Sequence, residues 1–337
     1  MTKKLLPTMI GAALIGGMSA ASADVTVFGH LDTSINNVDT EVAGVSTDDT
    51  NFHCTTCSVG FKGSEDLGNG LKAIFKLDFQ FDTINRNRAS DGTNSITDRD
   101  QWVGLAGGFG QVRIGTISTV YKSHGAMIDP LYRTFLQGRD HGLQSPFHSG
   151  AGEELQGRAT NTVRWDSADF NGVKLGAHYT LDSDEAVEDD NPYGVGASYS
   201  NGGILVFADY MTNDGSATNP AGDLSGWKVG GKYSMNNFAV MGQYEDGEDD
   251  SASEEATLWH IAGTYTMGNN TVYAGYGQGE IEVPGVTVDT DAWTIAAMHK
   301  MSKRTMVYAG YNNFEEDDPI GVNLEEDTFS LGLKHKF

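Results

Sequence analysis

A strict alternation of apolar and polar residues is the feature that most constrains this chain. Residues 70–83 read GLKAIFKLDFQFDT and place Leu71, Ala73, Phe75, Leu77, Phe79 and Phe81 on one face, opposite Lys72, Lys76, Asp78, Gln80 and Asp82. A helix would mix these two sets, so the period of two predicts a β-strand with one wet face. The same pattern recurs at 173–182, 227–235, 259–267, 293–297 and 328–337, which predicts an all-β protein.

The connectors between the predicted strands are of two kinds, and the two kinds alternate. The short ones carry tight-turn residues and lie at 64–70, 107–110, 168–172, 201–203, 235–237, 267–270 and 301–304. The long ones are polar and lie at 37–52, 84–98, 117–157, 183–191, 212–225, 246–256, 281–290 and 315–326. Seven short and eight long connectors join sixteen strands. Their alternation puts every long loop at one end of the sheet, as in an up-and-down antiparallel barrel.

Aromatic residues near the strand ends favour a barrel that spans a membrane. Trp102, Trp165, Tyr179, Tyr193, Tyr199, Tyr210, Trp227, Tyr233, Trp259 and Trp293 cluster there, as expected of rings at the two lipid headgroup levels. The alternative is a secreted soluble β-sandwich that binds carbohydrate or mediates adhesion. A sandwich would bury its apolar faces against a second sheet, and nothing would require its short and long connectors to segregate.

The start of the chain predicts export. Lys3 and Lys4 precede an apolar stretch from Leu5 to Met18, and small residues lead up to Ala23. This arrangement indicates a signal peptide over residues 1–23, cleaved after Ala23. The remaining chain, 24–337, has 20 Lys and Arg (22 less Lys3 and Lys4) against 46 Asp and Glu, a net charge of −26. Nucleic acid is therefore excluded as a partner, since a polyanion requires clustered positive charge.

The end of the chain fits a closed ring. In 328–337, TFSLGLKHKF, the residues Phe329, Leu331, Leu333 and Phe337 would face lipid. Thr328, Ser330, Gly332, Lys334 and Lys336 would face the lumen. A chain can stop in mid-strand if that strand pairs with the first one, because a closed barrel leaves no edge unpaired.

Five stretches together resemble a known family. They are VTVFGHLDTSI, SVGFKGSEDLGNGLKAIFKLDFQFD, RDQWVGLAGGFGQVRIGT, NTVRWDSADFNGVKLGAHYT and MSKRTMVYAGY followed by the terminal Phe. The chain resembles the general, trimeric, sixteen-stranded porins of Gram-negative outer membranes. The resemblance implies a passive channel for small hydrophilic solutes and ions, not an enzyme. It also implies a homotrimer with the 84–98 loop as a latch over the neighbouring subunit, and recognition of Phe337 by the barrel-assembly machinery.

The resemblance also assigns a constriction. Its inward-folded loop falls on 117–157, the longest connector, and its cationic wall positions fall on His30, Ser58, Arg99 and Arg164. Arg113 and Arg158 share the lumen parity and are predicted to join them. A usual arginine is here Ser58 and a usual lysine is His30, so we expect a weaker wall field, to which His30 would add charge as pH falls toward about 6.5. The alternative for any one of these arginines, Arg158 in particular, is a salt bridge that holds the loop.

The inward loop carries charges of both signs. It contains Arg133 and Arg139, and either Asp129 or Asp140 is expected to be the acidic partner of the cationic wall. Opposed charges across a narrow pore would give a transverse field that selects among solutes. The arginines favour anions, but the overall acidic excess gives a weak preference for cations. The physiological solute, the exclusion size and gating are outside the reach of the sequence.

Cys54 and Cys57 allow two interpretations. In a regular strand, residues three apart point to opposite faces, which argues against a bridge. If the chain curls there, a disulfide forms readily in an oxidising compartment, and we favour this interpretation. A zinc site would lack two of its four ligands apart from His53.

Acidic runs occur in three of the long connectors, at 182–190, 245–255 and 315–327. They would surround the pore mouth, attract cations and bind divalent ions weakly together with lipopolysaccharide phosphates. The spacing matches no dedicated calcium loop, so neither a cofactor nor a specific metal site is predicted.

An outer-membrane barrel enzyme is the remaining alternative. The chain has no Gly-x-Ser-x-Gly elbow, and His124, His141 and His148 fall in the predicted inward loop, away from any identifiable nucleophile.

Overall fold

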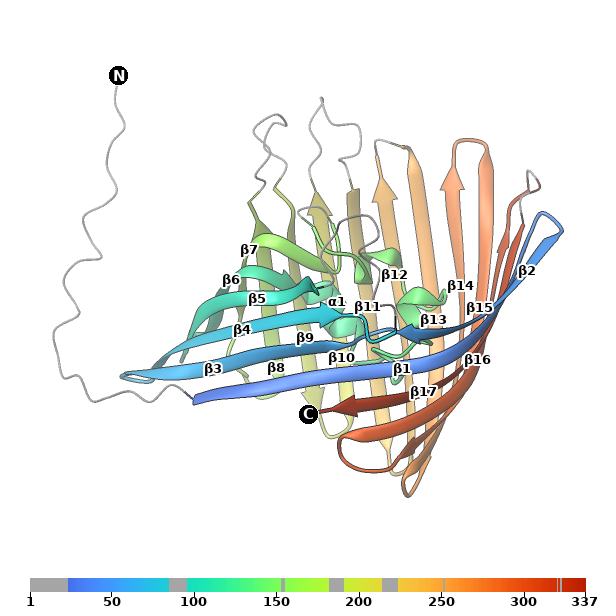
Figure 1. Ribbon diagram of the computed structural model, residues 1–337. Helices are drawn as coiled ribbons and strands as arrows, with labels where there is room; N and C mark the ends of the chain where they lie inside the picture. The colour runs from blue at the N-terminus through green and yellow to red at the C-terminus, as the bar shows by residue number, and fades with distance from the viewer. Residues whose placement is uncertain are drawn as a thin grey trace.

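The protein is a single closed ring of antiparallel strands (Figure 1). The computed structural model describes residues 24–84, 96–152, 155–181, 191–213, 224–250, 252–319, 321 and 323–337. Within these ranges the strands are β1 (Asp24–Val42), β2 (Val45–Cys54), β3 (Ser58–Gly68), β4 (Leu71–Phe81), β5 (Ile96–Gly107), β6 (Gly110–Ser118), β7 (Arg158–Asp166), β8 (Val173–Thr180), β9 (Tyr193–Asn201), β10 (Ile204–Asn213), β11 (Leu224–Met235), β12 (Phe238–Asp249), β13 (Glu254–Met267), β14 (Asn270–Val283), β15 (Val286–Lys300), β16 (Thr305–Asp317) and β17 (Leu324–Lys336). In the part of the chain just defined, no helix has the length and apolar character needed to cross a membrane.

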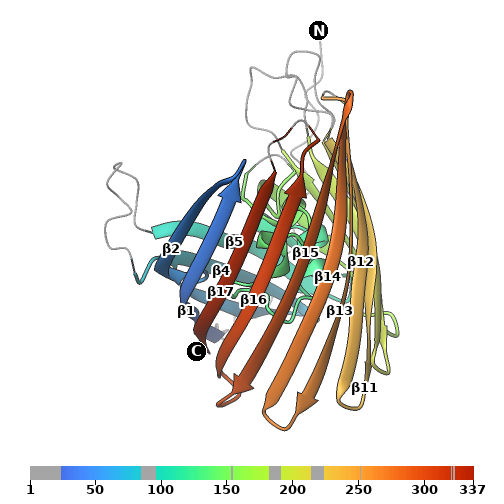
Figure 2. The ribbon, with the colours of Figure 1, turned by 90° about the vertical axis from the view of Figure 1, so that its right-hand side faces the viewer.

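The seventeen strands occupy sixteen positions of the ring. Each strand from β3 to β16 pairs with its successor, and β17 pairs with β1, which closes the ring. β2 and β3 both pair with β1, over 33–42 and 24–30 respectively, so they are two halves of one interrupted strand. Figure 2 shows β1 lying beside β17 at this closure. The sixteen-position antiparallel barrel predicted from the connectors is therefore confirmed.

The strands have an apolar outer face and a mostly polar inner face. On β17, Phe329, Leu331 and Leu333 are exposed outward, whereas Thr328 and Ser330 are buried on the inside. β10 shows the same exposed and buried alternation over its first eight residues. Outward apolar side chains at every second residue are favourable against lipid or a neighbouring subunit, because exposing apolar surface to water is unfavourable.

An aromatic belt crosses the outside of the barrel from β9 to β16. Four ring pairs on neighbouring strands form it, with centroid distances of 5.3–6.4 Å: Tyr193 with Tyr210, Trp227 with Tyr244, Trp259 with Tyr276, and Trp293 with Tyr311. Each strand contributes one ring near the end that carries the long connectors. This belt is the predicted arrangement for one membrane interface.

The short connectors are tight turns, as predicted. Asn69 and Gly70 between β3 and β4 have φ of 53° and 77°, and two successive positive φ values are typical of a type I′ hairpin. Four predicted long loops, at 37–52, 246–256, 281–290 and 315–326, are instead mostly strand. There the hairpins continue past the aromatic belt, and β1 turns into β2 at Ala43 and Gly44. Polar residues on both faces do not end a strand there, since both faces are outside the lipid and can be hydrated.

Three predicted features fall on residues outside the described ranges. These are the signal peptide 1–23 with its cleavage after Ala23, most of the 84–98 latch, and the acidic run at 182–190.

Candidate pore constriction

The segment 117–157 between β6 and β7 folds into the barrel (Figure 1). It contains the helix α1 (Val120–Gly125) and two short 3₁₀ turns, η1 (Gly138–Asp140) and η2 (Pro146–His148). Thr119 caps α1, accepting a hydrogen bond from the Lys122 N–H at 3.2 Å. Ile128, Leu131 and Leu136 of this segment pack in one buried cluster with inward-facing apolar residues of the wall, Leu205, Phe207, Met241, Tyr273, Met298 and Tyr308. We call 117–157 the inward loop.

The tip of the inward loop is fastened to β2, β16 and β17. The Phe135 N–H donates to the Tyr308 hydroxyl at 3.3 Å, and the Lys334 ammonium donates to the Tyr132 carbonyl at 2.5 Å. The His53 and Phe135 rings meet edge to face with centroids 5.1 Å apart. The loop therefore crosses the lumen and narrows it, as the resemblance implied.

Two aspartates on the wall, Asp78 and Asp100, pair with the first group of predicted arginines, Arg99 and Arg158. The Arg158 Nε–H donates to Asp100 Oδ1 at 3.0 Å, and Lys76 donates to Asp100 Oδ2 at 2.9 Å. Asp78 lies 3.7 Å from Arg99 Nε and 3.5 Å from Lys76 Nζ. Arg99 and Arg158 are both buried in the lumen.

A third aspartate holds the second group. Asp166 accepts from Arg164 Nη2 at 2.7 Å and also from Arg113. Arg164 donates in addition to the Ser118 carbonyl and, at 3.1 Å, to the Ser123 hydroxyl in α1. The guanidinium of Arg113 lies over the Trp102 ring, 5.1 Å from its centroid. Arg164 thus fastens the start of the inward loop, a role that sequence considerations had offered for Arg158.

The acidic residues of the inward loop do not face these arginines. Asp129 accepts from the N–H groups of Leu131 at 2.8 Å and Gly138 at 3.0 Å, so its carboxylate shapes the loop itself. The Asp140 side chain is 44% exposed, accepts from Gln137 at 2.5 Å and lies 3.7 Å from Arg139. The predicted opposition between an acidic loop and a basic wall is therefore wrong for both candidates, because the wall aspartates are the nearer partners.

The inward loop instead brings further positive charge to the wall. The guanidinium groups of Arg133 and Arg139 lie 5.7 Å and 5.2 Å from the centroid of the Tyr132 ring. Burial lowers the pKa of Lys122 well below its ordinary value, and repulsion from Arg158, Arg139 and Arg99 lowers it further. Positive groups of the loop and the wall are thus close enough to repel one another.

His30 and Ser58 lie side by side in the lumen. They are register partners on β1 and β3 and are both buried. His30 experiences the positive charges of four residues, namely Arg133, Lys334, Lys336 and Arg99. The wall next to His30 is cationic even though His30 and Ser58 depart from the family's usual lysine and arginine.

Cys54 and Cys57 are joined by a disulfide at the break between β2 and β3. The chain curls there, and the Asp32 N–H donates to the Thr56 carbonyl at 3.1 Å across the break. Cys57 is fully buried. His53, the residue before Cys54 on β2, contacts the tip of the inward loop from the wall.

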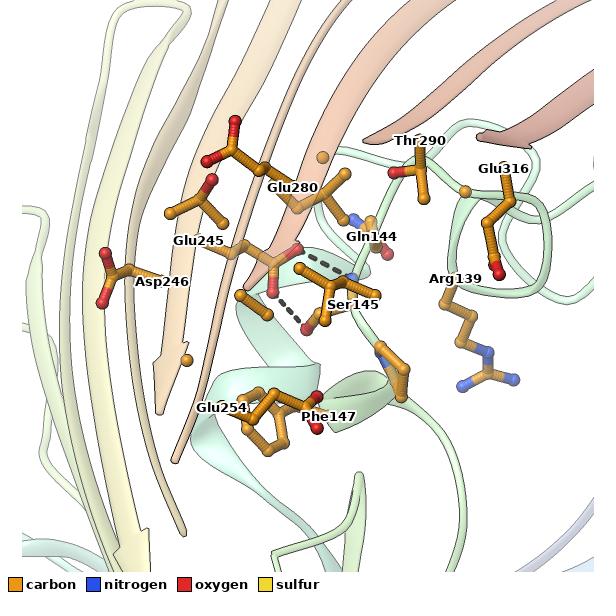
Figure 3. Close-up of a pocket in the computed structure, with 18 of the residues that line it drawn as sticks. Arg139, Gln144, Ser145, Phe147, Glu245, Asp246, Glu254, Glu280, Thr290 and Glu316 are labelled. Atoms are coloured by element: carbon orange, nitrogen blue, oxygen red, sulfur yellow. Dashed lines mark hydrogen bonds between the residues drawn. The ribbon is translucent and has the colours of Figure 1, made fainter. Parts of the chain in front are cut away.

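A cavity of about 560 Å³ lies between the inward loop and the wall formed by β11–β17. Figure 3 shows Glu245, Asp246 and Glu280 on one side of it, Glu316 and Arg139 on the other side, and Glu254 below. Asp140, Glu248, Asp249 and Glu326 also line it. The lumen is therefore acidic in this cavity and cationic where Arg99 and Arg158 lie.

Sequence considerations missed the residues beneath the inward loop. Lys228, Glu245 and Asp209 are buried on β10–β12, with Lys228 0% exposed. A signal was present for Asp209, which interrupts a strand whose neighbouring lumen positions, Phe207 and Met211, are apolar.

Comparisons with known proteins agree with this geometry. A family model described as Gram-negative porin matches residues 10–319. The major outer membrane protein P.IB of Neisseria meningitidis is 30% identical over 219 residues, which cover 61% of this chain and 58% of that protein. The chain thus spans about three fifths of the curated relatives' length.

Two solved structures share the fold. The anion-selective porin from Comamonas acidovorans has a TM-score of 0.76 at 20% identity, over 94% of this chain and 100% of that one. OmpT, an outer membrane protein of Vibrio cholerae in a trimer form, has a TM-score of 0.71 at 17% identity, over 94% and 100%.

Proposed function

Because this chain belongs to the Gram-negative porin family and is located in the outer membrane, we propose that it is a passive diffusion channel rather than an enzyme. Small hydrophilic solutes and ions would cross it while remaining hydrated. One observation carries this proposal: a closed ring with a polar lumen holds a long loop across its interior. An empty barrel of this size leaves a wide aqueous channel, so the inward loop would set the size limit.

Charge at the narrow part supports a preference for anions. On the wall, Arg99 lies near Arg158 and near Arg133 of the inward loop, and the nearby Asp78 and Asp100 are each shared between two cations. The acidic excess that favoured cations is concentrated in the wider cavity and the outer hairpins. Since the narrowest region dominates the barrier to an ion, we replace the weak cation preference with an anion preference. The solved anion-selective porin of similar fold is in keeping with this choice.

A homotrimer is part of the proposal. The support is the trimer form of a protein of the same fold and the exposed apolar residues of β1 and β3–β6, including Val25, Val27, Phe61, Val103 and Ile114.

Bilayer recording tests the channel and its ion preference together. Purified protein in a planar bilayer under a potassium chloride gradient is expected to give stepwise conductance and a reversal potential displaced toward the chloride equilibrium potential. Proteoliposomes should swell in small sugars and not in large ones. Absence of conductance and swelling would contradict the channel, and displacement toward the potassium potential would contradict the anion preference alone.

A further inference from the structure

Both ends of the inward loop return to one pair of wall residues. Lys228 on β11 and Glu245 on β12 are register partners. Tyr121, near the start of the loop, and Ser145 and His148, near its end, all bond to this pair. We call Lys228 and Glu245 the clamp pair.

Lys228 joins the two ends directly. Its Nζ donates to the Tyr121 carbonyl at 2.6 Å and to His148 Nε2 at 2.7 Å. The same ammonium stands 4.0 Å from the centroid of the Tyr121 ring, and Asp209 Oδ2 lies 3.8 Å away. Since an ammonium has three donors, two of them are used by the two ends of one loop.

Glu245 makes the same connection with its carboxylate. It accepts from the Tyr121 hydroxyl at 2.8 Å, and from the Ser145 N–H at 3.0 Å and hydroxyl at 2.5 Å. Figure 3 shows the two bonds between Ser145 and Glu245 at the edge of the acidic cavity. Glu245 is 2% exposed, although other acidic residues around that cavity face water.

The burial of this pair is costly and therefore informative. A charged group taken out of water destabilises the protein by several kcal/mol unless partners compensate, and a hydrophobic pair would often serve stability as well. Gly125 shows how closely the parts fit, since a Cβ there would lie 2.4 Å from His148 Nε2 and 3.1 Å from Lys228 Nζ. We infer that the hydrogen bonds from these buried charged groups favour one arrangement of the loop ends against the wall.

We propose that Lys228 and Glu245 are positioning residues that fix the inward loop at its base and thereby set the width and charge of the narrow part. The loop segment between the clamped ends carries Arg133 and Arg139. Without the clamp pair, the contact of His124 with Asp209 at the base would remain, together with the buried apolar cluster and the tip contacts with Tyr308 and Lys334. The inference rests on the proposed channel function. It adds to that function the residues that hold the inward loop in the narrow part of the pore.

Substitution of the clamp pair tests the inference. Lys228→Met and Glu245→Ala are expected to raise the open-channel current noise and to admit sugars that the unmodified protein excludes. The anion preference should fall at the same time, because Arg133 and Arg139 lose their fixed positions. Glu245→Gln keeps an acceptor oxygen, so it should restore most of the size exclusion that Glu245→Ala loses.

Two further variants keep the test decisive. Tyr121→Phe combined with Ser145→Ala removes hydroxyl donors from the loop side and leaves every strand residue intact, so it decides the matter if the wall variants fail to fold. Lys174→Met is the matched control, since Lys174 is 61% exposed on β8 and away from the inward loop. Folded, conducting variants with unaltered exclusion and noise would overturn the inference. An unmodified protein that does not conduct would instead overturn the channel proposal.

Discussion

Arg133 stands in a backbone conformation that side chains with a Cβ rarely adopt. Its φ is 65°, in the left-handed region. This conformation costs about 1–2 kcal/mol for a residue with a Cβ, and such strain persists where the surrounding structure enforces it. The Arg133 N–H donates to Gln137 Oε1 at 3.1 Å, and its guanidinium lies near the Tyr132 ring. The loop therefore presents this cation at the expense of its own stability.

Two substitutions at Arg133 should separate charge from strain. Arg133→Ala and Arg133→Gly remove the same charge, so both should reduce the anion preference measured as reversal potential. Only glycine relieves the strain, and the glycine variant should exceed the alanine variant in free energy of unfolding by about 1 kcal/mol. Denaturant midpoints of the protein in lipid vesicles measure this difference. Equal midpoints would show that the φ of Arg133 is not strained.

At the scale of residues, the sequence predicts which arginines face the lumen better than it predicts the residues with which they pair. Arg113 and Arg158 were predicted to face the lumen from the alternation within their strands, and Arg99 and Arg164 from the resemblance. All four pair with aspartates of the wall. Their partners depend on the register between strands and on where the inward loop comes to lie. Asp100 illustrates the limit, because it bonds Lys76 from β4, Arg158 from β7 and Ser118 at the end of β6.

At the scale of elements, lumen-facing apolar residues mark where the inward loop lies. Leu205 and Phe207 on β10 and Tyr273 on β14 break the polar lumen pattern, and all three pack against the loop. This exception was readable in the sequence, since an apolar side chain in an aqueous lumen needs a cover. The extended outer hairpins were less readable, because polar residues on both faces are equally compatible with a loop.

The disulfide turn between β2 and β3 should stabilise both the wall and the loop tip. Replacement of Cys54 and Cys57 together by serine removes a short covalent loop, with an expected loss of about 2 kcal/mol in the free energy of unfolding. Because His53, the residue before Cys54, contacts Phe135, the current noise of the open channel should also increase. Vesicle denaturation and bilayer recording measure the two effects. An unchanged midpoint would mean that β1 alone holds the turn.

At the scale of the whole molecule, Phe337 lies at the place where the ring closes. Phe337 and Gly29 exchange two backbone hydrogen bonds, at 3.0 Å and 3.1 Å, beside the last pairs of β1 and β17. Closure was predictable from the alternation in 328–337. This pattern indicates a strand, and the first strand of the chain can supply its pairing partner. The interrupted second strand was not, because its break depends on a curl between Cys54 and Cys57 that the spacing left open.

The ring of Phe337 covers Gly29, so a side chain at Gly29 should weaken closure. A Cβ at this position would lie 2.0–2.5 Å from three atoms of the ring, which must then move. Gly29→Ala is expected to cost about 1–3 kcal/mol, the usual range for overpacking. Refolding from urea into vesicles is the suitable measurement, because the assembly role implied for Phe337 does not enter. In a Phe337→Leu background the cost of Gly29→Ala should shrink, since the two effects are coupled through one contact. Gly108→Ala, where a Cβ meets nothing within 4 Å, should leave the midpoint unchanged, and an equal loss at Gly29 and Gly108 would refute the contact as the cause.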